Sequence, residues 1–305
     1  MPPWIPVTIF AAFMQTLRFT LQRHLKVTTL STAGATWARF LYSAPLVAVI
    51  VAVYAQTTAQ ALPTPGARFW AFLVPGALAQ VLGTMCIVAL FAVRNFTVGI
   101  TLMKTEVILT ALFGLLLLGE AISPPILLAI GLGFVGVVLL SDPPKGDTAL
   151  PWRARLFNAA SGYGLASGVF FGISAVGYRG ASLALPDGDV FLRASLTLAA
   201  ATAVQAVALG LWIAWRDRAE VGRVLASWRV SGLVGLTSML GSLGWFTAFT
   251  LQTAALVKAL GQIELVFTFL VSVFWLKERS SPKEIAGLAL LVASIGVIFW
   301  RGVAA

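Results

Sequence analysis

The chain has 305 residues, of which 59% are hydrophobic and only 10% are charged, whereas soluble proteins carry about 25% charged residues. One aqueous core cannot bury this much apolar surface, so the composition excludes a soluble globular protein and indicates an integral membrane protein. The net charge of +10 is no sign of nucleic-acid binding, because membrane proteins collect Lys and Arg in the loops that set their orientation.

Ten apolar stretches have, or nearly have, the length of about 20 residues that a helix needs to cross the hydrocarbon core. Short connections rich in Pro, Gly and Ser separate them. The sequence therefore predicts an all-α integral membrane protein with ten transmembrane helices. In chain order the expected spans are Trp4–Gln22, Thr29–Ala55, Phe69–Phe91, Thr97–Leu118, Pro124–Leu140, Asn158–Tyr178, Val190–Trp215, Val230–Thr250, Ala254–Leu276 and Pro282–Trp300.

The fourth and ninth expected spans contain related segments. Lys104–Thr110 is similar to Gln262–Thr268, which follows 158 residues later. Each segment places a glutamate inside the membrane, Glu106 in the first and Glu264 in the second. The chain is therefore expected to consist of two copies of one unit.

The most polar connection, 142–157, is the natural boundary between the copies. It leaves a first five-helix unit at residues 4–141 and a second at residues 158–301. Because five is odd, the second unit must enter the membrane in the opposite sense. Inverted repeats of this kind are the usual build of secondary transporters, with the substrate site near the bilayer midplane.

Two copies of five helices, each with an acid in the fourth, resemble the EamA branch of the drug/metabolite transporter superfamily. The resemblance covers nearly the whole chain and rests on Trp37–Leu41, Lys104–Glu120 and Gln262–Glu278. It implies a ten-helix secondary carrier, often an exporter, of amino acids, other metabolites or drugs across a bacterial inner membrane. Relatives often have proline directly after the buried glutamate. Val107 and Leu265 occupy these places here, so straighter helices are expected.

Apart from Lys283 and Glu284 at the first turn of the last span, seven charged residues lie inside the expected spans, and each costs about 2.5–3.5 kcal/mol at mid-bilayer. Such costs indicate pairing or function. The basic residues outnumber the acidic ones, which favours an anionic group such as a substrate carboxylate. Lys104 and Gln262 differ between the copies, and asymmetry is what a binding site on a symmetric frame requires. Arg18, Lys104, Lys258 and Gln262 are therefore the candidate substrate-binding residues.

The other four charges have two interpretations. In one interpretation Arg39, like Arg18, Lys104 and Lys258, binds an anionic group such as a substrate carboxylate. In the other, Arg39 and Arg193, which occupy similar places in the two copies, extend to the membrane surface or form permanent ion pairs with Glu106 and Glu264. The two glutamates either couple transport to a proton or cation, or only fix their helices through such pairs. Both interpretations stay open at this point.

Trp37 and Trp245 lie deep in their spans and are candidates for stacking on a substrate, although core packing is the simpler reading. The single cysteine and single histidine, Cys86 and His24, provide no disulfide, metal site or catalytic constellation. Gly131–Gly136 matches GxGxxG but lies inside an apolar span, so no nucleotide cofactor is expected. The sequence thus predicts no enzyme activity, no cofactor and no metal.

The preferred interpretation is a secondary transporter that exports a small metabolite, such as an amino acid or related carboxylate, by alternating access. One alternative is a proton-coupled exporter of cationic drugs that uses Glu106 or Glu264. Another is a membrane enzyme or assembly subunit without a transport cycle. Expected partners are a small-molecule substrate and the lipid bilayer, with no nucleic acid. The protein is expected to be a monomer or a homodimer.

Two arguments about the orientation of the chain in the membrane give opposite results. Thirteen basic residues follow odd-numbered spans and only three lie at the termini or in the other connections, so the positive-inside rule places both termini outside the cytoplasm. The family resemblance implies both termini inside. The sequence does not resolve this conflict.

Overall fold

The computed structural model describes residues 1–91, 102–140, 159–270 and 282–304, and all regular structure in these ranges is helical. The expected all-α class is therefore confirmed. The helices are α1 (Trp4–Thr28), α2 (Thr32–Thr57), α3 (Ala67–Leu90), α5 (Glu106–Leu118), α6 (Pro124–Leu140), α8 (Ala159–Leu183), α9 (Val190–Arg216), α10 (Arg218–Ala226), α11 (Trp228–Leu251), α12 (Ala254–Leu260), α13 (Ile263–Leu270) and α14 (Pro282–Ala304).

Six of these helices, namely α1, α2, α3, α8, α9 and α11, are long and apolar enough to cross a membrane. Helices α5 and α6 and the apolar part of α14 are shorter. Large aliphatic side chains such as Leu116, Leu128 and Leu211 are exposed on the outer surface, as a lipid-facing surface requires. Ten crossings remain a prediction. The expected linker 142–157 lies outside the described residues, as do 97–101 and 271–276 of the fourth and ninth spans.

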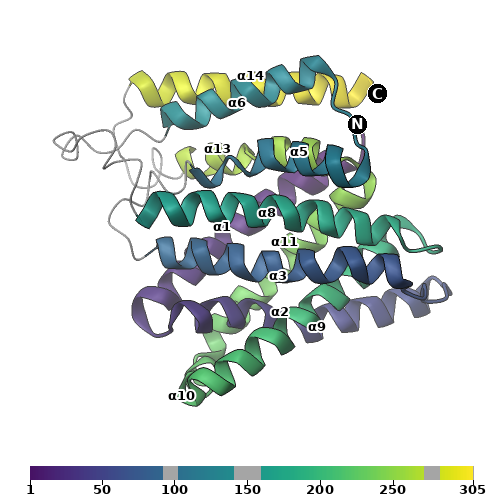
Figure 1. Cartoon of the computed structure of the whole chain (residues 1–305), viewed down its shortest axis with the longest axis vertical. Coiled ribbons are helices and arrows are strands. Elements are labelled where there is room, and N and C mark those ends of the chain that lie inside the picture. Colours follow the sequence, from purple (N-terminus) through teal and green to yellow (C-terminus); the bar gives the residue numbers. More distant parts are fainter. Residues whose placement is uncertain (92–101, 141–158, 271–281, 305) are drawn as a thin grey trace.

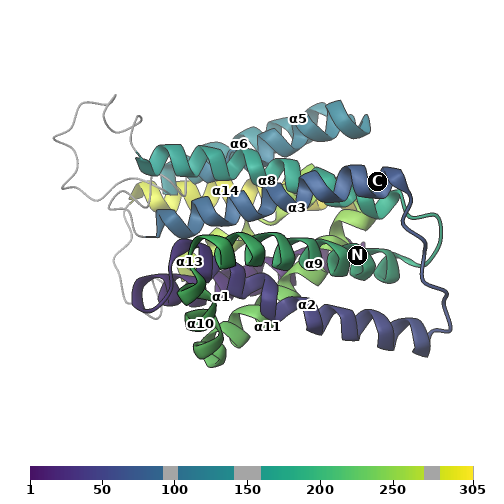
Figure 2. The ribbon, with the colours of Figure 1, turned by 60° about the horizontal axis from the view of Figure 1, so that its bottom comes forward.

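The helices before residue 141 pack mainly against helices after residue 158. Helix α3 lies along α8, α1 along α11, α2 along α9 and α6 along α14. In the two repeats α1 corresponds to α8, α2 to α9, α3 to α11 and α6 to α14. Replacing each helix by its counterpart therefore turns the α3–α8 contact into the α11–α1 contact, and it turns the α2–α9 and α6–α14 contacts into themselves. This packing fits a two-repeat architecture. Figure 1 shows α6 and α14 as a separate layer, and Figures 1 and 2 place both termini at one end of the bundle.

The helix that carries each membrane glutamate is interrupted just before it. Lys104 and Thr105 form a turn ahead of α5, and Gly261 and Gln262 form a turn between α12 and α13. The backbone hydrogen bonds there reach back three residues, for example from Glu264 N to Gly261 O at 3.2 Å. Such bonds tighten a helix locally.

The expectation of straighter helices at these points is therefore wrong. Val107 and Leu265 replace proline, but the interruption does not depend on proline, because tight local turns produce it. At Gly261 a Cβ would lie 2.3 Å from the Trp245 ring. The close approach of that ring requires glycine at this turn.

Side chains at helix ends fix several of these elements. Asp189 caps α9 by accepting from Leu192 N at 2.8 Å, and it also accepts from Gln60 and Tyr54. Desolvation acts to raise the pKa of Asp189, but these hydrogen bonds outweigh it and hold the pKa below its usual range. Helix α10 was not expected from the sequence, and its buried Glu220 accepts from the backbone N–H of Ser31 at 2.7 Å.

Helices α3 and α8 cross almost backbone to backbone at Gly76 and Gly177. A Cβ on Gly177 would lie 2.9 Å from Phe72 O and 3.0 Å from Gly76 Cα. We expect Gly177→Val to lower the free energy of unfolding by about 1–3 kcal/mol, because backbone cannot yield as a side chain can. Gly162→Val on the same helix is the control, since a Cβ there meets nothing within 4 Å. Detergent-titrated unfolding measures both, and equal losses would contradict the prediction.

Candidate functional site

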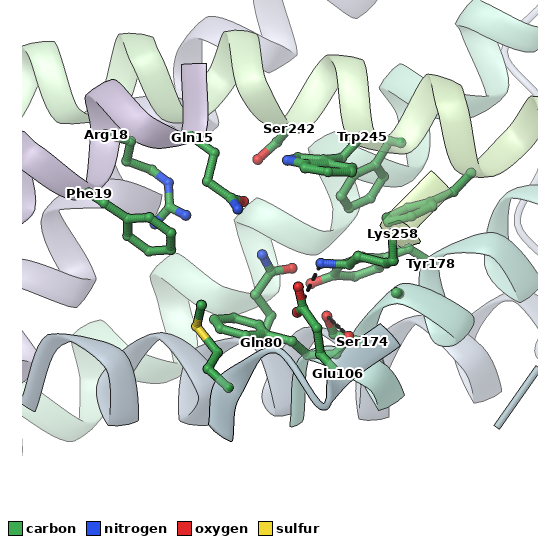
Figure 3. A pocket seen from close by; sticks show the side chains of 15 residues that line it. Gln15, Arg18, Phe19, Gln80, Glu106, Ser174, Tyr178, Ser242, Trp245 and Lys258 are labelled. Carbon is green, nitrogen blue, oxygen red and sulfur yellow. Dashed lines mark hydrogen bonds and ion pairs between the residues drawn. The ribbon is translucent and has the colours of Figure 1, made fainter. Parts of the chain in front are cut away.

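A pocket lies between the two halves of the bundle (Figure 3). It contains about 480 Å³ of space free of protein atoms, part of it open to solvent. Its wall combines aromatic rings with a few polar and charged side chains, as is typical of small-molecule sites. The polar residues are Gln15, Arg18, Gln80, Glu106, Ser174, Ser242 and Lys258, and the aromatic ones are Phe19, Phe171, Tyr178, Trp245, Phe246 and Phe249.

One side of the pocket holds an ion pair between the two halves. Lys258 Nζ on α12 lies 3.2 Å from Glu106 Oε2 at the start of α5. The same ammonium group lies 5.0 Å from the ring centroid of Trp245 and 5.7 Å from that of Phe171, so both rings stabilise its charge. Trp245 Nε1 is buried and has no hydrogen-bond partner in the part of the chain that the structure describes. Lys258 and Trp245 are thus the candidate residues that the structure places in the pocket wall together.

Arg18 on α1 borders the opposite side of the pocket (Figure 3). Its side chain is buried, with 3% of the residue exposed. Its Nη1 donates to Gln22 Oε1 at 2.6 Å, and its guanidinium carbon lies 4.3 Å from the Phe19 ring centroid. Within residues 1–91, 102–140, 159–270 and 282–304, no carboxylate pairs with Arg18. Glu264 attracts Arg18 without forming an ion pair with it and is itself paired with Lys104, so an anionic ligand would stabilise this buried cation.

Lys104 and Glu264 form a second ion pair, which also joins the two halves. Gln15 Nε2 donates to the other oxygen of Glu264 at 2.6 Å and connects this pair to the pocket. Lys104 and Gln262 line a separate small space beside α6 and α14. Gln262 Oε1 is buried without a hydrogen-bond partner. Lys104 and Gln262 therefore do not lie in the pocket that holds Arg18.

The structure does not form the expected pairs of Arg39 and Arg193 with the glutamates. Arg39 is buried and donates to the hydroxyls of Ser238 and Thr84 at 2.9 Å each. Arg193 is only partly buried near the start of α9, and its Nε has no partner. Each glutamate instead forms an ion pair with a lysine from the opposite half. These lysines lie 160 and 152 residues along the chain from the glutamates with which they pair.

Trp37 also lies away from the pocket. Its indole N–H donates to Ala206 O on α9 at 2.8 Å, and its ring packs against Gly210. Sequence reasoning missed Gln15 and Gln80, which are uncharged and carry no motif. The sequence feature that could have indicated them is an amide side chain inside an apolar span. In the part of the chain that the structure describes, no group of three His, Cys, Asp or Glu side chains is placed to hold a metal.

Comparison with known families resolves the class of protein. A family model described as the EamA-like transporter family matches residues 2–142 and again residues 159–300. The chain belongs to the EamA-like transporter family. It is thus a multi-pass membrane protein and a transporter of small molecules, and membership in a family of transporters fits the expectation that it is not an enzyme.

The fold of this EamA-like protein also has a relative among solved structures. One described only as "Crystal structure of protein" superposes with a TM-score of 0.68 at 14% sequence identity and covers 97% of each chain. At this identity the likeness extends to the fold alone. No curated protein sequence matches the chain significantly. The family and the fold therefore leave the substrate to be argued from the pocket.

Proposed function

We propose that this protein is a secondary transporter that moves a small carboxylate, preferably an amino acid, out of the cell across the bacterial inner membrane. Arg18 carries this proposal, since it is a buried guanidinium at the pocket that forms no ion pair with any described carboxylate. A guanidinium binds a carboxylate through two parallel hydrogen bonds. The substrate then supplies the charge that the empty protein lacks.

Other groups in the pocket complement the same ligand. The unpaired indole N–H of Trp245 is a second donor, and the Lys258 ammonium is a third. Glu106 is the one carboxylate in the pocket wall among the described residues and suits the ammonium group of an amino acid. The two interrupted helices and the symmetric packing of the halves support alternating access, in which inverted five-helix units move around the pocket.

Purified protein in liposomes tests this function. Labelled amino acids and simple carboxylates are offered one at a time, and uptake is compared with empty liposomes. Saturable flux of a carboxylate is the expected result. Flux of neutral or cationic compounds only would overturn the assignment, and no flux of any compound would favour a subunit without a transport cycle.

A second candidate is proton-coupled export of cationic drugs through Glu106. It is favoured by the position of Glu106 in the pocket wall with a single 3.2 Å contact to Lys258. Under this alternative, Glu106→Gln and Glu264→Gln abolish drug resistance and leave carboxylate flux intact. Under the carboxylate proposal we expect Glu106→Gln to lower amino-acid flux without changing resistance to cationic drugs. Growth in drug and liposome flux distinguish the two.

We expect both termini to lie outside the cytoplasm. Helix α10 and its flanks expose Arg216, Arg218, Arg223 and Arg229, at the end of the bundle away from the termini (Figures 1 and 2). Clustered arginines remain on the cytoplasmic side during insertion. A C-terminal GFP fusion should therefore stay dark and a C-terminal alkaline phosphatase fusion should be active. A fluorescent GFP fusion would place the termini inside.

A further inference from the structure

A second buried guanidinium adjoins the pocket. Arg39 on α2 is 4% exposed and is surrounded by hydroxyl groups. Besides Ser238 and Thr84, its Nη2 reaches Ser242 Oγ at 3.5 Å, at the limit of a hydrogen bond. These partners are neutral, and no ion pair to Arg39 is formed among the residues that the structure describes. Among the described residues, the positive charge of Arg39 is therefore stabilised by neutral groups, namely these hydroxyls and the Phe40 ring at 5.1 Å.

Arg39 and Arg18 face neighbouring spaces with a common wall. The space beside Arg39 is lined by Gln80, Ser242 and Phe246, and the same three residues line the central pocket. The two guanidinium groups are close enough for their charges to repel each other. A ligand in the pocket that passes Ser242 therefore approaches the second guanidinium.

The charges at the centre of the bundle do not balance. Four cations, Arg18, Arg39, Lys104 and Lys258, share this region with two carboxylates, Glu106 and Glu264, when the described residues are counted. Each carboxylate is already paired with a lysine. The excess of two positive charges therefore resides on the two arginines. Buried charges are normally paired, because removing an ion from water costs several kcal/mol.

We propose that the preferred ligand carries two carboxylates, as a small dicarboxylate dianion or an acidic amino acid does, with one carboxylate bound by Arg18 and the other by Arg39. This inference rests on the proposed carboxylate transport and specifies its substrate class. A monoanion would neutralise one guanidinium and leave the other uncompensated. The hydroxyls of Ser238, Thr84 and Ser242 can rotate and donate to the second carboxylate, since a hydroxyl is both donor and acceptor.

Isosteric pairs that differ by one charge test this directly. Succinate, glutarate and adipate are each titrated against their monoamides, and glutamate against glutamine, by calorimetry on the purified protein at pH 7.5. The series covers several chain lengths because the separation of two anion sites selects one of them. We expect at least one dianion to bind 10-fold or more tightly than its monoamide. In Arg39→Gln this ratio should fall to about one.

Two further variants separate charge from structure. Arg39→Lys keeps the charge and should keep part of the ratio, whereas Arg229→Gln removes an exposed positive charge from α11 and should leave it unchanged. Equal affinity for every dianion and its monoamide, or a ratio that survives in Arg39→Gln, would overturn the dianion proposal while carboxylate transport stands. If no carboxylate binds at all, both proposals fall.

Discussion

Arg18→Gln should lower carboxylate transport strongly without lowering the stability of the empty protein. A hydrogen-bonded contact to a charged ligand contributes about 1.5–3 kcal/mol, so the apparent KM should rise about 10- to 100-fold. Stability should stay equal or increase, because Arg18 has no carboxylate partner in the described structure to lose. Liposome flux gives the KM, and detergent-titrated unfolding gives the free energy.

The combination of these two readouts makes the prediction specific. A purely structural arginine would show the reverse, lost stability with little change in KM for the surviving protein. Arg18→Lys is expected to be intermediate, because lysine keeps the charge but cannot make two parallel hydrogen bonds. Arg23→Gln, one turn further along α1 and exposed, is the matched control. An unchanged KM in Arg18→Gln would remove Arg18 from the substrate site.

Lys104→Met should be among the most destabilising single substitutions in the chain. Lys104 is 2% exposed and pairs with Glu264, and removing one partner of a buried pair leaves the other charge uncompensated at a cost of about 3–5 kcal/mol. Gln15 would then be the main remaining hydrogen-bond donor to Glu264. Unfolding in mixed micelles at neutral pH measures the loss.

The double variant Lys104→Met/Glu264→Gln provides the control. It removes both charges at once, and the pair of neutral side chains should recover most of the lost free energy. The free energy of unfolding that the double variant recovers, relative to the sum of the two single variants, is the coupling energy of the pair. A general loss of packing does not contribute to it, because such a loss is present in the single variants as well. If the double variant is as unstable as the sum of the single ones, Lys104 and Glu264 do not stabilise each other.

Hydropathy was sufficient for the position of most helices. Each of the ten apolar stretches is mostly helical where the structure describes it, because every backbone group in a bilayer must be bonded within its own segment. The turns at Lys104–Thr105 and Gly261–Gln262 were missed. Their residues carry no sequence signal for a turn. Glycine is required at position 261 because the Trp245 ring packs against it, and no local sequence pattern reveals that contact. Helix α10 was missed because it is short and polar.

The partners of the buried charges were less predictable than the charges themselves. Lys104, in the turn ahead of α5, and Glu106, at the start of α5, have different partners. That Lys104 meets Glu264 and Lys258 meets Glu106 depends on where two helices cross about half the chain apart. Arg18 was identified as a candidate from its charge and from the lack of a basic counterpart in the second copy, whereas only the folded structure shows that no described carboxylate forms an ion pair with it.

The packing of one half against the other has a consequence for how the protein is made. While the ribosome is still producing α8 to α14, helices α1, α2, α3 and α6 have entered the membrane without their main neighbours. The helices of the first half are therefore expected to be inserted in the lipid before they pack. The contacts between residues far apart in the sequence can form only when synthesis nears its end. Conversely, the halves made as two chains together contain every major contact, and behave as the subunits of a heterodimer.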